Sequence, residues 1–250
     1  MPAKAFLSEC QRRENEIDAA MLGMLRCHAG GADVQRVERM TLEEAKKVLG
    51  GELLTGYQGT LLCVHTVSAL KMLNIHLAIL HAQIDYAMRT LDDIRSFNTL
   101  VMAPDWDRLD CHPRAIVALD GFISDGERAL AQMRFPDARL IEVTDMGAHT
   151  VRACGHLLPD DDHLRAIYRV LRQREKLEYT LHSLAAETGL AESQVLCAMS
   201  IFSELNLIEC TFEPLRYTLL KSGKVSLEAS PLRGRLIRMK GLYGEGGIPD

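Results

Sequence analysis

The sequence predicts an α/β protein with a mostly parallel sheet, preceded by N-terminal helices and followed by a C-terminal winged-helix module. Short, nearly continuous apolar runs lie between residues 57 and 146, which is typical of strands that helices bury on both faces. Beyond residue 160 the apolar positions recur every three or four residues, the spacing of amphipathic helices. Composition agrees, because 47% hydrophobic and 25% charged residues are ordinary for a globular protein.

The first segment, residues 1–56, is predicted to be helical. Residues 5–27 place apolar side chains on one helical face and are predicted to form a single helix. A second helix is predicted to begin at Thr41, because Thr41 and Glu44 have the spacing of a capping box, and to end at a glycine pair.

The second segment, residues 57–146, is predicted to form the sheet domain. Strands are expected at 60–65, 99–104, 115–120 and 139–144. Helices are expected between them, at 67–73 and 125–133, as in layered α/β domains. The stretch 74–88 stays open, since HLAIL favours a strand and QIDYAMRTL a helix. The sheet should therefore have four or five strands.

A linker at 147–159 leads into the predicted winged-helix module at 160–222. Its first helix follows three aspartates, which suit a helix N-terminus. The sequence AAETGLAESQV then has the form of a helix-turn-helix, with Gly189 in the turn. The segments LIEC and RYTL are expected to pair as a hairpin, with EPL as the wing. Residues 223–250 form a C-terminal tail.

Charge is unevenly distributed along the chain, whose net charge is −5. Residues 163–240 contain twelve Lys and Arg against eight Asp and Glu, whereas the rest of the chain contains 17 against 26. Basic residues on the first helix of the module share one face, and a second basic group lies in the tail. The basic face of this helix is consistent with an ordinary solvated surface and equally with a contact for phosphates or acidic peptides. The candidate residues for binding a partner or nucleic acid are Arg165, Arg169, Arg172, Lys176, Arg233 and Arg235.

No sequence motif indicates a catalytic, metal or nucleotide site. The turn after the first predicted strand, HTVSAL, lacks the G-x-G-x-x-G fingerprint, and neither a P-loop nor a G-x-S-x-G motif occurs. Neighbouring Cys and His residues lack the paired spacing of structural zinc sites. Asp120 and Asp145 follow strand ends, where ligand groups can lie, but such aspartates also cap turns and helices. The structural interpretation is favoured for both.

The sequence predicts a cytoplasmic location. The seven cysteines are odd in number and irregularly spaced, which suits a reducing compartment. No uncharged apolar run reaches the ~20 residues that cross a membrane, and the N-terminus is too polar for a secretory signal. We therefore expect no membrane partner.

Several segments resemble the C-terminal region of RecJ-type single-stranded-DNA exonucleases of Firmicutes and related bacteria. The similarity covers roughly residues 57–240 and rests on the order and spacing of motifs that are each weak alone. These motifs are GTLLCVHT, IRSFNTLVMAPDW, RAIVALDG, LPDDDHLRAIYRVLRQ, VLCAMSIFSELNLIE and KVSLEASPLRGRL. In the last motif Arg233 stands where the family often has an aromatic residue.

The resemblance implies an accessory role without catalysis. That family cuts DNA in an upstream domain, where D-x-D and D-H-H clusters hold divalent metals that activate water. The nearest sequence here, Asp110-Cys111-His112, does not match, so no catalytic residue, metal or cofactor is assigned to this chain. The implied partners are the acidic tail of single-strand-binding protein or the nuclease's own catalytic domain, together with single-stranded DNA.

An alternative function is a stand-alone winged-helix regulator whose α/β domain senses a small ligand. A recognition helix should contact phosphates through Lys or Arg. The second helix of the predicted helix-turn-helix, 190–207, contains neither and carries two glutamates. A third possibility, a small enzyme with an unrecognised α/β active site, has no motif to support it. The accessory role is favoured.

Overall fold

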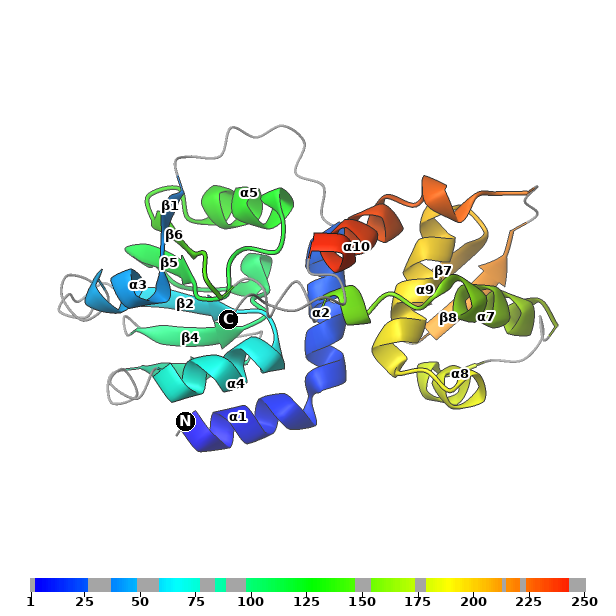
Figure 1. The fold of residues 1–250 in the computed structure, drawn as a ribbon, viewed down its shortest axis with the longest axis horizontal. Coiled ribbons are helices and arrows are strands. Elements are labelled where there is room, and N and C mark those ends of the chain that lie inside the picture. Colours follow the sequence, from blue (N-terminus) through cyan, green and yellow to red (C-terminus); the bar gives the residue numbers. More distant parts are fainter. Residues whose placement is uncertain are drawn as a thin grey trace. The chain divides into compact units, whose positions relative to one another are not determined.

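The computed structural model describes residues 3–26, 37–48, 59–76, 84–88, 98–146, 154–173, 179–212, 215–220 and 224–242. The chain divides into two compact units, Met1–Ala153 and Cys154–Asp250 (Figure 1). The first unit is an α/β layer structure, as the apolar runs predict.

The described part of the first unit contains six parallel strands in the order β1-β6-β5-β2-β4-β3. These are β1 (Glu38–Met40), β2 (Thr60–Val64), β3 (Asp85–Ala87), β4 (Thr99–Met102), β5 (Ala115–Ala118) and β6 (Arg139–Val143). Every residue of β2, β4 and β5 is buried, which explains their continuous apolar sequences. The four predicted strands are confirmed, each ending one or two residues earlier than expected.

Helices cover this sheet on both faces. The chain leaves β2 through α4 (Val67–His76) toward β3, on the far side of β4, and leaves β5 through α5 (Asp125–Arg134) toward β6, in the opposite direction along the sheet. Right-handed crossovers in opposite directions place their helices on opposite faces. Figure 1 accordingly shows α4 and α5 separated by the strands. The direction changes between β2 and β5, the position where such folds often bind ligands.

The N-terminal part differs from the predicted single helix. It forms α1 (Ala3–Arg12) and α2 (Glu14–Arg26), separated by a turn at Arg13. The apolar side chains form two groups with only polar residues between them, so burial does not hold one continuous helix together. α1 contacts α4 and β3, while α2 contacts α5. α3 (Leu42–Val48) begins after Thr41, as the capping box predicts.

Two strands were missing from the sequence prediction, so the expected sheet of four or five strands was too small. β1 lies within the supposedly helical segment 1–56 and pairs with β6. β3 lies within the open stretch 74–88 and pairs with β4. Each has three residues, too few for an alternating or continuous apolar pattern to stand out. Both lie at the sheet edges, where pairing to one neighbour defines them.

The second unit contains helices followed by a hairpin and a last helix. Its elements are α7 (Asp161–Gln173), α8 (Leu181–Thr188), α9 (Glu192–Glu204), β7 (Ile208–Phe212), β8 (Leu215–Leu219), the 3₁₀ turn η3 (Leu227–Ala229) and α10 (Pro231–Leu242). Gly189 ends α8 in the left-handed conformation, with φ of 70°. β7 and β8 pair antiparallel, as predicted.

Helix length bears on membrane insertion. Within the described segments, no helix is both long enough and apolar enough to cross a bilayer.

Candidate binding pocket in the C-terminal unit

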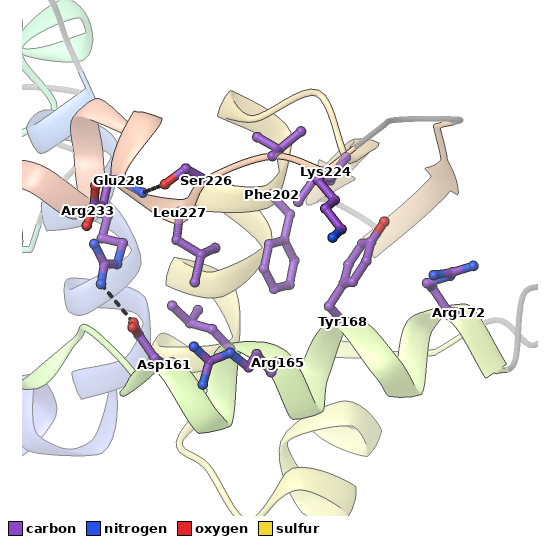
Figure 2. A pocket seen from close by; sticks show the side chains of 13 residues that line it. Asp161, Arg165, Tyr168, Arg172, Phe202, Lys224, Ser226, Leu227, Glu228 and Arg233 are labelled. Atoms are coloured by element: carbon purple, nitrogen blue, oxygen red, sulfur yellow. Dashed lines mark hydrogen bonds and ion pairs between the residues drawn. The ribbon is translucent and has the colours of Figure 1, made fainter.

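The second unit contains a pocket of about 500 Å³ between α7, α9 and the segment that follows the hairpin (Figure 2). Its volume is in the range that holds a small ligand or a few side chains. It is lined by Asp161, Leu164, Arg165, Tyr168, Arg172, Phe202, Leu207, Lys224, Val225, Ser226, Leu227, Glu228 and Arg233.

The centre of the pocket is apolar. The rings of Tyr168 and Phe202 lie tilted against each other with their centroids 5.4 Å apart. Phe202 is buried, whereas Tyr168 is half-buried and presents part of its ring to the pocket. Leu227 projects toward them from the opposite wall, and Val225 beside it is 40% exposed. The exposed apolar area favours a ligand with an apolar group.

Helix α7 forms one wall because its sequence is strongly amphipathic. Leu164, Ile167 and Leu171 are buried along one face and anchor the helix to the core. Tyr168 and Arg172 are one turn apart and line the pocket together. The face of α7 opposite its buried residues therefore forms the polar wall of the pocket.

The opposite wall is fixed by Glu204 at the end of α9. Its Oε2 accepts hydrogen bonds from the Ser230 hydroxyl at 2.6 Å and from the Leu232 backbone N–H at 3.0 Å. Ser230 Oγ in turn accepts from the Arg233 backbone N–H. The Glu204 carboxylate and the Ser230 hydroxyl thus each satisfy one N–H group at the start of α10, and together they hold the segment 226–233 beside α9.

Four cations line the pocket in two different electrostatic states. Arg233 is paired with Asp161 at 2.8 Å, and Arg165 with Asp162 at 2.8 Å. Arg172 and Lys224 are exposed, and within the described part of the chain neither has an ion-pair partner. These two side chains are available to bind an anionic group.

The structure brings three of the six predicted residues into this pocket: Arg165, Arg172 and Arg233. Arg169 lies exposed on α7 outside the lining, and Arg235 lies half-buried on α10. Lys176 falls outside the described residues. Because the basic face of α7 is wider than the pocket, Arg169 is an edge position rather than a lining one.

Sequence reasoning missed Lys224, Val225 and Leu227 as site residues. They lie in an irregular segment after the hairpin, where neither helical nor strand periodicity operates. Phe202 is buried in the core of the unit and also forms the pocket centre. The KVSLE sequence, a cation followed by apolar residues at alternate positions, was the available signal.

The α/β unit contains a second cluster of ionisable groups. It lies at the ends of β2 and β5, the neighbouring strands whose connections leave in opposite directions along the sheet. His65 follows β2, Asp120 follows β5, and Glu127 lies in the first turn of α5. His65 Nδ1 lies 2.7 Å from Asp120 Oδ1, and its Nε2 lies 2.7 Å from Glu127 Oε1. All three side chains are completely buried. In this arrangement they contact no solvent, which favours a structural role.

The backbone around this cluster completes its hydrogen bonding. Asp120 Oδ2 accepts from the His65 backbone N–H at 2.9 Å, and Glu127 Oε2 accepts from the Ile123 N–H at 2.9 Å. The Trp106 indole N–H donates to Glu127 Oε1. Asp120 therefore acts as a capping and ion-pairing residue. Asp145 is also structural, because it accepts from the Leu42 N–H at the start of α3.

The pKa of His65 reflects this environment. Burial alone would lower the pKa, but the charges of Glu127 and Asp120 and their hydrogen bonds outweigh it and raise the pKa well above its usual value. A protonated imidazolium donates from both ring nitrogens, one to each carboxylate. The cluster is thus an ion triad that joins the ends of two strands to α5.

Metal coordination has no support among the described residues, where no group of three His, Cys, Asp or Glu side chains is placed to hold an ion. Burial raises the pKa of the Cys10 thiol to about 12 and that of Cys197 to about 12, which keeps both thiols protonated at neutral pH.

The pocket combines an apolar centre with two cations that have no ion-pair partner among the described residues, a set suited to holding an anionic group beside an apolar one. The chain matches no family model, no curated protein and no solved structure. The chemistry of the lining residues is therefore the guide to the ligand of this pocket.

Proposed function

We propose that the chain is a non-catalytic accessory module of a RecJ-like single-stranded-DNA exonuclease of DNA repair and recombination. In this role its C-terminal unit docks an acidic segment of a protein partner, such as the tail of single-strand-binding protein. The observation that carries the proposal is the apolar pocket flanked by Arg172 and Lys224, two cations without a partner among the described residues.

Three segments that resemble the exonuclease family also supply the walls of this pocket. LPDDDHLRAIYRVLRQ contains α7, VLCAMSIFSELNLIE contains most of α9, and KVSLEASPLRGRL contains η3 and the start of α10. Residues far apart in sequence are thereby combined in one site. This coincidence supports a shared function of the three segments.

The order of helices and hairpin in the second unit supports its interpretation as a winged helix. In such a module α9 would be the recognition helix. Eight of its residues are buried, and they include Ser193, Ser200 and Phe202. A helix that contributes so much to the core has little surface for reading a DNA groove. We therefore propose at most weak DNA contact, through the arginines of α7, and disfavour the stand-alone regulator.

The proposed setting is the cytoplasm, where free thiols persist. The described cysteines are free, and most of them are buried. The proposal includes no cofactor for this chain, and assigns the divalent metals of the nuclease reaction to a separate catalytic domain.

Peptide binding tests the proposal. The full chain is titrated into a fluorescein-labelled acidic peptide with an apolar tip, taken from the tail of a bacterial single-strand-binding protein. Arg172→Glu combined with Lys224→Glu should weaken binding by about tenfold or more, since two charge-assisted contacts of ~1 kcal/mol each become repulsive. Fluorescence anisotropy reports the Kd.

The matched control is Arg238→Glu, which reverses an exposed charge on α10 outside the pocket lining. Its Kd should stay within about twofold of the unmodified chain, and circular dichroism should show all variants folded. Equal affinities for the pocket variant and the control would contradict docking at this pocket.

Nuclease activity provides a separate test of the accessory role. The purified chain, incubated with labelled single-stranded DNA and Mg²⁺ or Mn²⁺, should leave the DNA intact on a denaturing gel. Metal-dependent digestion that copurifies with the chain would overturn the non-catalytic assignment.

A further inference from the structure

The two ends of the pocket differ in charge. At the start of α7 the lining residues Asp161, Glu228, Arg165 and Arg233 are balanced, two acidic and two basic. Asp162, an exposed residue outside the lining, pairs with Arg165 and so places a further negative charge next to this end. Figure 2 shows Asp161, Arg233 and Glu228 together at this mixed-charge end.

At the other end, the described charged residues of the lining are basic. Arg172 and Lys224 lie on either side of Tyr168 (Figure 2), and neither has an ion-pair partner among the described residues. No carboxylate of the lining is drawn at this cationic end. Arg169, exposed one turn before the end of α7, extends the positive surface outside the pocket.

Between the two ends lies the apolar centre of Tyr168, Phe202 and Leu227. A side chain inserted there leaves the flanking parts of its peptide near opposite ends of the pocket. Acidic residues on the side of Arg172 gain attraction, whereas acidic residues on the other side meet Asp161 and Glu228. Like charges brought together at an interface disfavour binding.

Building on the proposed docking function, we infer that the pocket selects a one-sided acidic peptide. The apolar anchor occupies the centre, the acidic run leaves over Arg172, and the residues beyond the anchor are neutral or basic. The mixed-charge end thus acts as a specificity element that rejects segments with acidic residues on both sides.

Two synthetic peptides separate this inference from simple charge attraction. Both are acetylated and amidated, so that terminal charges do not contribute. One carries four aspartates, a phenylalanine and four glycines, and the other carries four aspartates on each side of the phenylalanine. They are titrated against the full chain at about 0.1 M salt, where the screening length of ~10 Å lets the ends act separately.

The two-sided peptide should bind no tighter than the one-sided peptide, despite its doubled charge. Glu228→Gln should strengthen binding of the two-sided peptide by about two- to fivefold, the size of one partly exposed charge pair, and change the one-sided peptide by less than about twofold. The matched control is Glu209→Gln, which removes an exposed carboxylate on β7 outside the lining and should change neither Kd.

The outcomes distinguish the two proposals. If both peptides bind but the two-sided one is more than twofold tighter, or if Glu228→Gln has no more effect than the control, the selectivity is wrong and docking stands. If neither peptide binds, both proposals fail.

Discussion

The α/β unit and the C-terminal unit use ionisable side chains in opposite ways. In the first, His65 is completely buried and bridges two carboxylates with contacts of 2.7 Å on each side. In the second, Arg172 and Lys224 are exposed beside an apolar pocket, with no partner among the described residues. Buried groups whose hydrogen bonds and ion pairs are all made within the unit belong to the fold. Exposed cations without a partner are available to a ligand. We therefore expect substitution of the buried cation to reduce stability and substitution of the exposed cations to reduce binding.

The largest expected effect follows from removing the buried cation. His65→Ala leaves Asp120 and Glu127 as uncompensated buried carboxylates and should lower the free energy of unfolding by about 3–5 kcal/mol. Urea denaturation followed by circular dichroism measures it. His182→Ala is the control, because that side chain is 86% exposed, and should change stability by less than about 0.5 kcal/mol.

A milder variant keeps this test valid if His65→Ala fails to fold. Trp106→Phe removes the indole N–H that donates to Glu127, together with part of a buried ring, and should cost about 1–3 kcal/mol. Stability changes no larger than that of the His182 control for both cluster variants would refute a structural role for the ion triad.

The pH dependence of stability should differ between the unmodified chain and His65→Ala. Because the folded-state pKa of His65 is raised, its contribution is complete below the unfolded pKa of about 6.5 and declines as the pH rises toward the folded value. The stability difference between the two chains should therefore be larger at pH 6 than at pH 8.5. Urea midpoints across this range measure it, and a difference that grows with pH would have the wrong sign.

The pocket cations should show the converse behaviour, small for stability and larger for binding. Arg172→Ala should change the unfolding free energy by less than about 0.5 kcal/mol, as exposed substitutions usually do. The same variant should weaken binding of the acidic peptide by about three- to tenfold, because it removes one charge-assisted contact. A large loss of stability would place Arg172 in the fold rather than in the site.

The smallest expected effect concerns Arg169, which lies outside the pocket lining. Arg169→Glu should weaken peptide binding by about two- to threefold, and the effect should disappear when the salt concentration reaches about 1 M, where the screening length falls to ~3 Å. Anisotropy titrations at two salt concentrations measure this. An effect that persists in high salt would indicate direct contact.

Local patterns predicted most of the fold but little of the binding site. The strands Thr60–Val64 and Ala115–Ala118 were predictable because burial on both faces leaves a continuous apolar sequence. The edge strands Glu38–Met40 and Asp85–Ala87 were not, since their identity depends on partners distant in sequence. The break at Arg13 was not predicted either, because the apolar residues before and after the polar stretch keep the same helical phase.

The pocket illustrates the same limit. Helical spacing on α7 identified Arg165 and Arg172, whose shared face a single helix defines. Lys224 and Leu227 enter the site through tertiary contacts of an irregular segment held by Glu204. The sequence favoured a structural interpretation of Asp120, but its pairing with His65, which itself contacts Glu127, depends on three separate elements.

The edge pairing of β1 with β6 affects how the chain folds during its synthesis. Met40 lies opposite Val143, so β1, the first strand to be synthesised, can pair only after β6, the last strand of the sheet, has been synthesised. At 5–20 residues per second, the intervening ~100 residues take about 5–20 s to emerge. The hairpin of the C-terminal unit, by contrast, pairs residues at most 11 positions apart, as in Ile208 with Leu219. Because distant contacts form slowly, we expect completion of the six-stranded sheet to limit the folding rate of the α/β unit.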